Sequence, residues 1–167
     1  MNKDLPEQKV VSHIELPKFM GKWYVIANIP TMFEKGAYNA TEFYNWNTKE
    51  NRIDVDFRFN KDSFDGPEKS IPQKAFVYDH ESNAEWRIQP IWPLKFAYLI
   101  IDVAADYSDT VIGVPGRDHV WIMARTPQIE SARYQSIIAK ISSLGYDLSK
   151  LQKVPQSVPQ SAQALTH

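Results

Sequence analysis

Short stretches of alternating hydrophobic and polar residues recur along the first 125 residues of this chain. In the clearest of them, Ile53, Val55, Phe57 and Phe59 are separated by charged residues. Such alternation places the two sets of side chains on opposite faces of a β-strand, one buried and one solvated. Further strands, bounded by turn residues, are expected at 23–29, 39–46, 73–78, 85–89, 96–103, 109–114 and 119–125. Eight short strands at fairly even spacing predict an all-β fold, an eight-stranded antiparallel up-and-down β-barrel.

A single helix is predicted after the last strand. Thr126 is a suitable N-cap, and Pro127 suits the first helical position. Lys140 falls in the last turns, and Gly145 is a typical C-terminal stop. Apolar residues recur between them at helical spacing, at Ile129, Tyr134, Ile137, Ile138, Ile141 and Leu144. We expect this apolar stripe to pack on the outer wall of the barrel.

The chain is expected to form one folded domain between two extensions. Residues 1–12 form a polar N-terminal extension, and the domain is expected to span residues 13–153. From Val154 the near-repeat Val-Pro-Gln-Ser-Val-Pro-Gln-Ser offers no hydrophobic face for packing. Residues 154–167 are therefore predicted to be a disordered tail.

The composition fits one ordinary domain. A chain of 167 residues is long enough to bury most of its apolar surface. The 19 Lys and Arg against 20 Asp and Glu give a net charge of −1, so we expect no nucleic-acid partner. Aromatic residues make up 13%, which favours a ligand-holding β-fold over a helical one. No apolar run approaches the length of about 18 residues that a membrane-spanning helix needs.

Missing sequence features limit the chemistry and targeting of this chain. Met1–Lys9 is polar and lacks the apolar segment of a signal peptide, so the chain is expected to carry none. The absence of cysteine excludes disulfides, thiol catalysis, thiolate metal sites and a cysteine-linked lipid anchor. There is no G-x-S-x-G motif, metal-binding histidine pair or glycine-rich phosphate loop. We therefore expect no cofactor and no metal site.

Two motifs about a hundred residues apart suggest how one end of the barrel is closed. Gly21-Lys22-Trp23-Tyr24 is a glycine turn that opens a strand with a buried aromatic residue, and Trp121–Pro127 ends a strand on Arg125. An indole face attracts a guanidinium ion by about 0.5–2 kcal/mol. We expect Arg125 to cover Trp23 as a structural floor, so that the barrel becomes a cup for an apolar ligand.

Four segments, in order and correctly spaced, resemble the lipocalin family, and within it the bacterial lipocalins close to apolipoprotein D. The first is Gly21-Lys22-Trp23-Tyr24, which matches the family's G-x-W-Y motif. The others are Ile29-Pro30 with Phe33-Glu34-Lys35-Gly36, Ala105-Asp106-Tyr107 in place of T-D-Y, and Trp121–Pro127. The resemblance covers roughly residues 13–152.

The resemblance implies an eight-stranded calyx with the helix packed outside. It also implies the carriage or storage of a hydrophobic molecule, such as a fatty acid or lysophospholipid, at the bacterial cell envelope. Members of this subgroup are usually exported, often as outer-membrane lipoproteins. In the chain as given we expect neither a leader nor a lipobox cysteine. From the resemblance we expect a periplasmic or outer-membrane location for a full-length form. Contact of that form with a membrane surface would use a lipid anchor that the chain as given does not show.

Strand parity predicts which side chains face the ligand. If Arg125 covers the floor, then Met123, Trp121 and His119 lie on the same face of their strand and climb toward the mouth. Alternation also sets the faces of the strands around Phe57 and Trp86, whereas the resemblance sets those of the strands at 39–46, 73–78 and 96–103. The expected ligand-binding set is Ala40, Glu42, Tyr44, Val55, Phe57, Ala75, Val77, Trp86, Ile88, Tyr98, Ile100, Asp102, His119, Trp121 and Met123.

The polar members of this set leave several functions open. Glu42 and Asp102 are candidates for a site that binds a choline-like head group, for solvated mouth residues, or for a general acid/base pair. They face outward instead if the parity of their strands is shifted by one residue. His119 is the one plausible catalytic imidazole of an isomerase or lipid hydrolase. A dimeric interaction module is the third alternative, with Phe33 and Trp92-Pro93 available for a homodimer contact. We expect a non-enzymatic carrier, with Met32 and Phe33 near the entrance.

Overall fold

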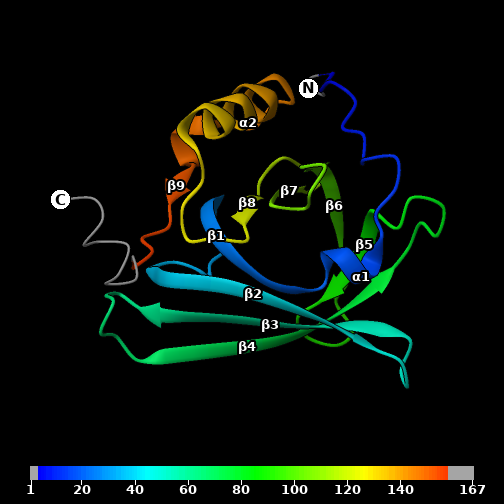
Figure 1. Cartoon of the computed structure of the whole chain (residues 1–167), viewed down its shortest axis with the longest axis horizontal. Coiled ribbons are helices and arrows are strands. Elements are labelled where there is room, and N and C mark those ends of the chain that lie inside the picture. Colours follow the sequence, from blue (N-terminus) through cyan, green and yellow to red (C-terminus); the bar gives the residue numbers. More distant parts are fainter. Residues whose placement is uncertain (1–3, 158–167) are drawn as a thin grey trace.

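The computed structural model describes residues 4–157, and its centre is a closed antiparallel β-barrel (Figure 1). The eight barrel strands are β1 (Gly21–Ile29), β2 (Ala37–Asn47), β3 (Arg52–Lys61), β4 (Glu68–Val77), β5 (Glu85–Gln89), β6 (Phe96–Val103), β7 (Asp109–Gly113) and β8 (Val120–Ala124). Consecutive strands pair in order, β8 pairs with β1, and a second pairing of β1 with β2 closes the barrel. The predicted fold class is confirmed.

The strand boundaries differ most at β4, which begins at Glu68 rather than at residue 73. The segment from Glu68 to Pro72 is mostly polar, so its hydrophobic pattern does not mark a strand. It is nevertheless paired along β3, with Glu68 opposite Asn60 and Pro72 opposite Asp56. Pairing with the regular strand β3 therefore extends β4 beyond the part that its own hydrophobic pattern specifies.

Helix α2 (Ser131–Ser143) begins later than predicted. Glu130 is the N-cap residue, and the hydroxyl of Thr126 donates to the carbonyl oxygen of Gln128 at 2.6 Å. The prediction of Thr126 as N-cap and Pro127 as first helical residue is wrong, because the threonine hydroxyl is used in a local turn instead. The predicted end is right: Gly145, with a φ of +98°, follows the C-cap residue.

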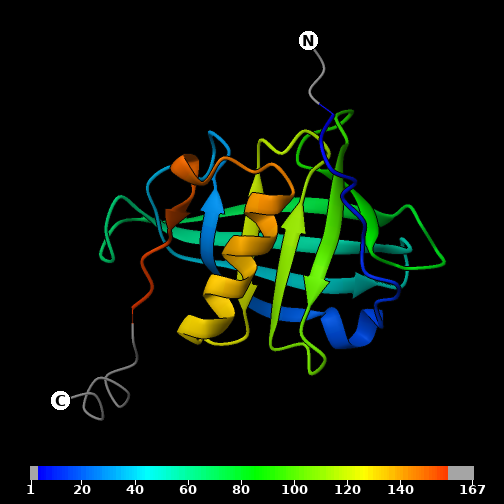
Figure 2. The ribbon, with the colours of Figure 1, turned by 90° about the horizontal axis from the view of Figure 1, so that it is seen from above.

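The helix covers one side of the barrel. Figures 1 and 2 show α2 lying outside β1, β8, β7 and β6, while the long strands β2–β4 form the opposite wall. Ile137 and Ile141 are fully buried against outward-facing residues of these strands, among them Ile101 and Ile122. The expected packing of the apolar stripe on the outer wall is confirmed, and this leaves the barrel interior free for a second, separate core.

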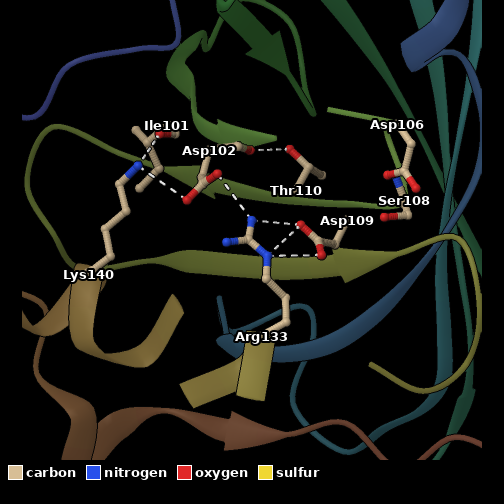
Figure 3. Close-up of polar contacts among 8 residues, drawn as sticks. All are labelled: Ile101, Asp102, Asp106, Ser108, Asp109, Thr110, Arg133 and Lys140. Carbon is tan, nitrogen blue, oxygen red and sulfur yellow. Dashed lines mark hydrogen bonds and ion pairs between the residues drawn. The ribbon is translucent and has the colours of Figure 1, made fainter. Parts of the chain in front are cut away.

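A cluster of charged side chains fixes α2 to the barrel (Figure 3). Arg133 donates to both carboxylate oxygens of Asp109 at 2.8–3.1 Å and to Asp102 at 3.1 Å. Lys140 contacts the other carboxylate oxygen of Asp102 at 3.3 Å and the carbonyl oxygen of Ile101 at 2.8 Å. The hydrogen bonds that Arg133 donates to Asp109 and Asp102 raise the pKa of its guanidinium group above the usual value.

This cluster overturns the predicted inward orientation of Asp102. The pairing register of β6 with β7 shifts between Ile100 and Asp102, as at a β-bulge. Ile101 consequently joins the outer apolar cluster, and the carboxylate of Asp102 lies beneath the helix. A bulge adds one residue and reverses the parity of everything beyond it, which simple alternation does not anticipate.

Replacing Arg133 by methionine is expected to lower the free energy of unfolding by about 2 kcal/mol, because the carboxylate of Asp109 would remain buried without its cation. Urea unfolding of the variant measures the loss. The double variant R133M/D109N removes the unpaired charge and should recover part of it. A double variant as unstable as the sum of the two single variants would contradict this coupling.

Both ends of the described chain contact the barrel. In the predicted N-terminal extension, the backbone N–H of Val11 donates to the carbonyl oxygen of Ile100 at 3.0 Å. The side chain of Gln156 donates to the carbonyl oxygens of Val25 and Ala40 at 2.8 and 2.9 Å. Residues 154–157 of the predicted disordered tail are therefore part of the folded domain, and the remainder of that prediction, 158–167, lies outside the described residues.

Three short elements were not predicted: α1 (Leu16–Phe19), the 3-10 helix η1 (Leu148–Lys150) and β9 (Gln152–Lys153), which pairs with β1. The helix α1 matters for the site, because its last residue, Phe19, is fully buried in the barrel core. Within residues 4–157, no helix combines the length and the apolar composition required to span a membrane.

Candidate functional site

A cavity of about 710 Å³ occupies one end of the barrel interior. Its wall combines inward-facing strand residues with residues of three loops, those between β1 and β2, β5 and β6, and β7 and β8. The apolar part of the wall includes Phe57, Ile71, Ile88, Tyr98 and Trp121. The volume and the mostly apolar lining are typical of a small-molecule site.

The opposite end of the barrel is sealed by Arg125 and Trp23. The guanidinium carbon of Arg125 lies 3.7 Å from the centre of the Trp23 ring. Its N–H groups donate to the backbone carbonyl oxygens of Lys18 (2.8 Å), Phe19 (3.1 Å), Met20 (2.9 Å), Lys22 (2.8 Å) and Tyr107 (3.4 Å). This is the arrangement that the two sequence motifs predict, and it ties α1 across the floor of the cup.

Aromatic side chains fill the space between this floor and the cavity. Neighbouring ring centroids are 5.1–5.9 Å apart along the series Trp23, Phe19, Tyr44, Trp86, Tyr98 and Trp121. The last two rings line the cavity, whereas the first four do not. The lower part of the barrel is therefore a packed core, and the ligand space is confined to the part nearer the loops.

The predicted ligand-facing residues consequently divide into four groups. Those that line the cavity are Glu42, Phe57, Ile88, Tyr98, His119 and Trp121. Those that are buried in the inner core without lining it are Ala40, Tyr44, Val55, Ala75, Trp86, Ile100 and Met123. Val77 is partly buried against the same core, and Asp102 lies outside the barrel. An inward orientation therefore does not by itself place a side chain in the wall of the cavity.

Three carboxyl groups line the cavity. Asp118 is exposed at the rim beside His119, whereas Glu34 and Glu42 are more buried and differ in their partners. Glu34, from the β1–β2 loop, accepts hydrogen bonds from the indole N–H of Trp121 at 3.1–3.2 Å and from the side chain of Asn28 at 3.2 Å. Glu42, on β2, is 5% exposed, and its Oε2 atom has no hydrogen-bond partner among the described residues. A buried acceptor in this condition is uncommon and calls for an explanation.

Burial dominates the titration of both groups. It raises the pKa of Glu34 to about 7, although the hydrogen bond from Trp121 opposes the shift. It raises the pKa of Glu42 well above the usual value, and the nearby charge of Glu34 adds to the effect. Below these pKa values the protonated acids are the stable forms, so the calyx favours neutral carboxyl groups as long as no cation lies beside them.

The hydroxyl groups of Tyr44 and Tyr98 form a hydrogen bond with each other inside the barrel. Burial raises the pKa of both phenols well above the usual value. His119 is at the rim, where its Nδ1 atom lies 3.3 Å from the carbonyl oxygen of Ile29. Because Asp102 lies outside the barrel, the acid/base pair of Asp102 and Glu42 considered from the sequence is not assembled.

Sequence reasoning did not find Glu34 as a site residue. The segment Phe33–Gly36, which contains it, resembles the lipocalin family. A glutamate in a loop, however, is part of no periodic pattern that would place its side chain in the barrel interior. The expected entrance position of Met32 and Phe33 agrees with their place in the cavity wall. Both are largely exposed, at 76% and 59%, and Trp92 of the β5–β6 loop is 81% exposed.

Metal binding has little support in the described part of the chain. Within residues 4–157, no three His, Asp or Glu side chains gather as a metal site would require. The cavity also contains neither a histidine pair nor a thiol. What the geometry offers is an apolar cup with a sealed floor and three acidic groups in its wall, the architecture of a small-molecule-binding class of barrel.

This chain belongs to the lipocalin family: the model of the lipocalin-like domain matches residues 14–156. It is 32% identical over 160 residues to temperature-induced lipocalin-1 of Arabidopsis thaliana, covering 90% of this chain and 84% of the relative. It is 26% identical over 147 residues to outer membrane lipoprotein Blc of Escherichia coli, covering 88% and 82%. Bovine apolipoprotein D is 30% identical over 135 residues, covering 74% and 67%. The resemblance inferred from the four segments is confirmed.

Solved structures support the same fold. Lobster apocrustacyanin A1 superposes with a TM-score of 0.68 at 11% identity, covering 90% of this chain and 86% of that one. Insecticyanin from the tobacco hornworm Manduca sexta also gives 0.68, at 15% identity, covering 95% and 88%. At such low identity these likenesses establish the barrel architecture, and the function has to be argued from the site.

Proposed function

We propose that this chain is a non-enzymatic carrier or store of a fatty acid or lysophospholipid, held with its hydrocarbon chain in the calyx. The observation that carries the proposal is the cavity of about 710 Å³, with an apolar wall above a sealed aromatic floor. Burial of hydrocarbon contributes roughly 0.8 kcal/mol per CH₂ group, so such a cup selects for chain length. Membership of the lipocalin family supports a hydrophobic ligand in general.

The proposed place of action is the bacterial cell envelope. The support is the similarity to the Escherichia coli relative, which is named an outer membrane lipoprotein. Fractionation of cells that produce the protein from its natural gene, followed by immunoblotting, tests this location. Recovery with the cytosolic fraction alone would remove the envelope from the proposal and leave the lipid-binding function standing.

The first experiment is native mass spectrometry of the purified protein with extraction of any bound lipid. Displacement of a fluorescent fatty acid by fatty acids and lysophospholipids of increasing chain length then follows. We expect two added methylene groups to tighten binding about tenfold until the cup is full. Affinities that do not change with chain length, with no lipid retained, would overturn a lipid-binding function.

A larger side chain in the cavity wall should reduce the length of hydrocarbon chain that the cavity can accommodate. Ile71 lines the cavity on β4, and Ile71→Trp is expected to weaken binding of long chains at least tenfold while short chains bind almost as before, because the added indole ring occupies ligand space. Displacement titrations across the chain-length series measure the shift. The control, Lys74→Trp, adds the same ring to the exposed face of the same strand. Equal losses in the two variants would contradict a calyx-bound chain.

A further inference from the structure

We propose that Glu42 and Glu34 form a subsite for an aliphatic ammonium group, so that the calyx prefers amphiphiles with a cationic head. The inference rests on the proposed function, since it takes the cavity to hold an amphiphile, and it specifies the chemistry of the polar end. The ammonium group would lie beside Glu42, and the hydrocarbon chain would extend along the apolar wall toward the loops.

Other carboxylates that the fold buries are paired with cationic side chains. Beneath α2, Asp102 and Asp109 are paired with Arg133 and Lys140 at 2.8–3.3 Å. Inside the calyx, by contrast, neither glutamate forms an ion pair with a lysine, arginine or histidine of residues 4–157. Buried carboxylates generally have a cationic or hydrogen-bonding partner. Glu34 has hydrogen-bond donors in Trp121 and Asn28, whereas Oε2 of Glu42 has neither kind of partner among the described residues. A cation supplied by a ligand completes this site.

The Oε2 atom of Glu42 is a buried acceptor without a donor among the described residues. The residue is 95% buried, it lines the cavity, and this oxygen has no donor within the described structure. An ammonium group carries three N–H donors and would supply a charge-assisted hydrogen bond. A fatty acid carboxylate placed at the same position would bring a third acidic group to the pair, so a ligand of that kind is disfavoured there.

Aromatic rings line the same cavity as the two acids. The rings of Tyr98 and Trp121, 5.9 Å apart, and the ring of Phe57 line the same cavity as the carboxyl groups. Aromatic faces attract ammonium ions, and more strongly where water is excluded. Glu34 holds the indole of Trp121 in place through its hydrogen bonds, so one acidic residue also orients part of the aromatic surface.

Binding of an ammonium ion should release a proton. Burial keeps Glu42 protonated when the calyx is empty, and a cation beside it would favour the ionised form. Two further charged residues line the cavity: Lys95, whose Nζ atom lies 4.3 Å from the centre of the Phe76 ring, and the exposed Asp118 beside His119. The titratable or charged groups that act on Glu42 or on its neighbours are Glu34 of the β1–β2 loop, Asp56 of β3, Tyr44 of β2, Tyr98 of β6, His119 at the rim and Arg125 at the floor. Only the two glutamates have raised carboxyl pKa values among these groups, so they are the expected source of the proton.

The test compares dodecylamine, dodecanol and dodecanoic acid, which share one chain and differ in the head group, by displacement and calorimetric titration at pH 7. The wild-type protein should bind the amine roughly 10–100-fold more tightly than the alcohol. Glu42→Gln should abolish this preference and leave the alcohol within about twofold of the wild type. Calorimetry in buffers of different ionisation enthalpy should show proton release with the amine, and Glu42→Gln should reduce it.

The control is Glu50→Gln, which makes the same change of charge in the exposed β2–β3 turn and should behave as the wild type. Near-ultraviolet circular dichroism checks that each variant is folded. Alcohol binding without a preference for the amine, or an equal effect of both variants, would overturn the subsite and leave the proposed function intact. Failure of all three ligands to bind would overturn the proposed function and the subsite with it.

A second comparison identifies the source of the ammonium group. Lysophosphatidylethanolamine carries an ammonium group in its head, whereas lysophosphatidylglycerol of the same chain length does not. If Glu42→Gln weakens binding of the first lipid and not of the second, the subsite reads a lipid head group. If the loss is confined to dodecylamine, the subsite reads a simple aliphatic amine. Either result supports the ammonium site.

Discussion

Replacing Arg125 by alanine is expected to lower the free energy of unfolding by about 3–5 kcal/mol. The guanidinium group contacts the Trp23 ring at 3.7 Å and donates to backbone carbonyl oxygens of α1, of β1 and of the turn before β7. Truncation leaves these oxygens without their donor at a partly buried site, and it removes the cation from the indole face.

The loss should be visible as a fall of about 10 °C in Tm, since a chain of this size shifts roughly 2–4 °C per kcal/mol. Differential scanning calorimetry and urea unfolding measure it. Arg125→Lys keeps the charge but not the planar set of donors, so it should retain about half of the stabilisation.

The matched control is Arg58→Ala on β3. The side chain of Arg58 is 57% exposed, and its ion pairs with Asp56 and Glu68 lie on the outer surface. Exposed ion pairs contribute about 0–1 kcal/mol, so this variant should unfold close to the wild type. A loss below about 1 kcal/mol for Arg125→Ala would show that the floor is held by the packing of Trp23 and Phe19 instead.

The sequence allowed the barrel to be predicted because each face of its strands has a different environment. The alternation from Ile53 to Phe59 is strict, since one face of β3 belongs to the inner core and the other carries Asp54, Asp56 and Arg58. The floor was predictable for a different reason: tryptophan and arginine are few, and their chemistry pairs them wherever a strand end brings them together.

The errors arise where one local event changes the geometry of many residues. The register shift near Ile101 turned Asp102 to the outer wall, and no residue type there marks a bulge. Thr126 satisfied an N-cap rule, but its hydroxyl is used in a turn that precedes the helix. Glu34 lines the cavity from a loop, where hydrogen bonds from Asn28 and Trp121 hold it, and such a tertiary effect leaves no local pattern in the sequence. The division between packed core and ligand space also depends on how α1 inserts Phe19.

Glu42→Gln is expected to raise the free energy of unfolding at pH 8 by about 3 kcal/mol and to change it little near pH 4.5. Burial raises the pKa of Glu42 well above 4.5, so the folded protein holds a proton that the unfolded chain releases as the pH rises. Between the pKa of the group in the unfolded chain and its pKa in the folded protein, the unfolding free energy falls by roughly 1.4 kcal/mol per pH unit and per group. Glutamine has no charge to desolvate and escapes this penalty.

The pH range in which Glu42 lowers the free energy of unfolding differs from the range in which carboxyl groups with lowered pKa values act. Hydrogen bonds and ion pairs lower the pKa values of Asp54 and Asp56, so their stabilisation is lost only as the pH falls through their folded-state values. Glu34, with a pKa of about 7, contributes to the decline between pH 4.5 and 7 and adds no further slope above that range. The wild-type protein should therefore be most stable near pH 5.

Urea unfolding of the wild type, Glu42→Gln and the control Glu50→Gln at pH 5, 6.5 and 8 measures these slopes. The first variant should show a shallower decline than the other two proteins, and Glu50→Gln should follow the wild type because its carboxyl group is exposed. Dodecylamine should stabilise the wild type more at pH 8 than at pH 5, since the ionised acid is the form that a cation favours. If the free energy of unfolding of the wild type does not change from pH 5 to 8, the carboxyl group of Glu42 has access to water or to a partner in solution. That result would contradict an unsatisfied acid in the calyx.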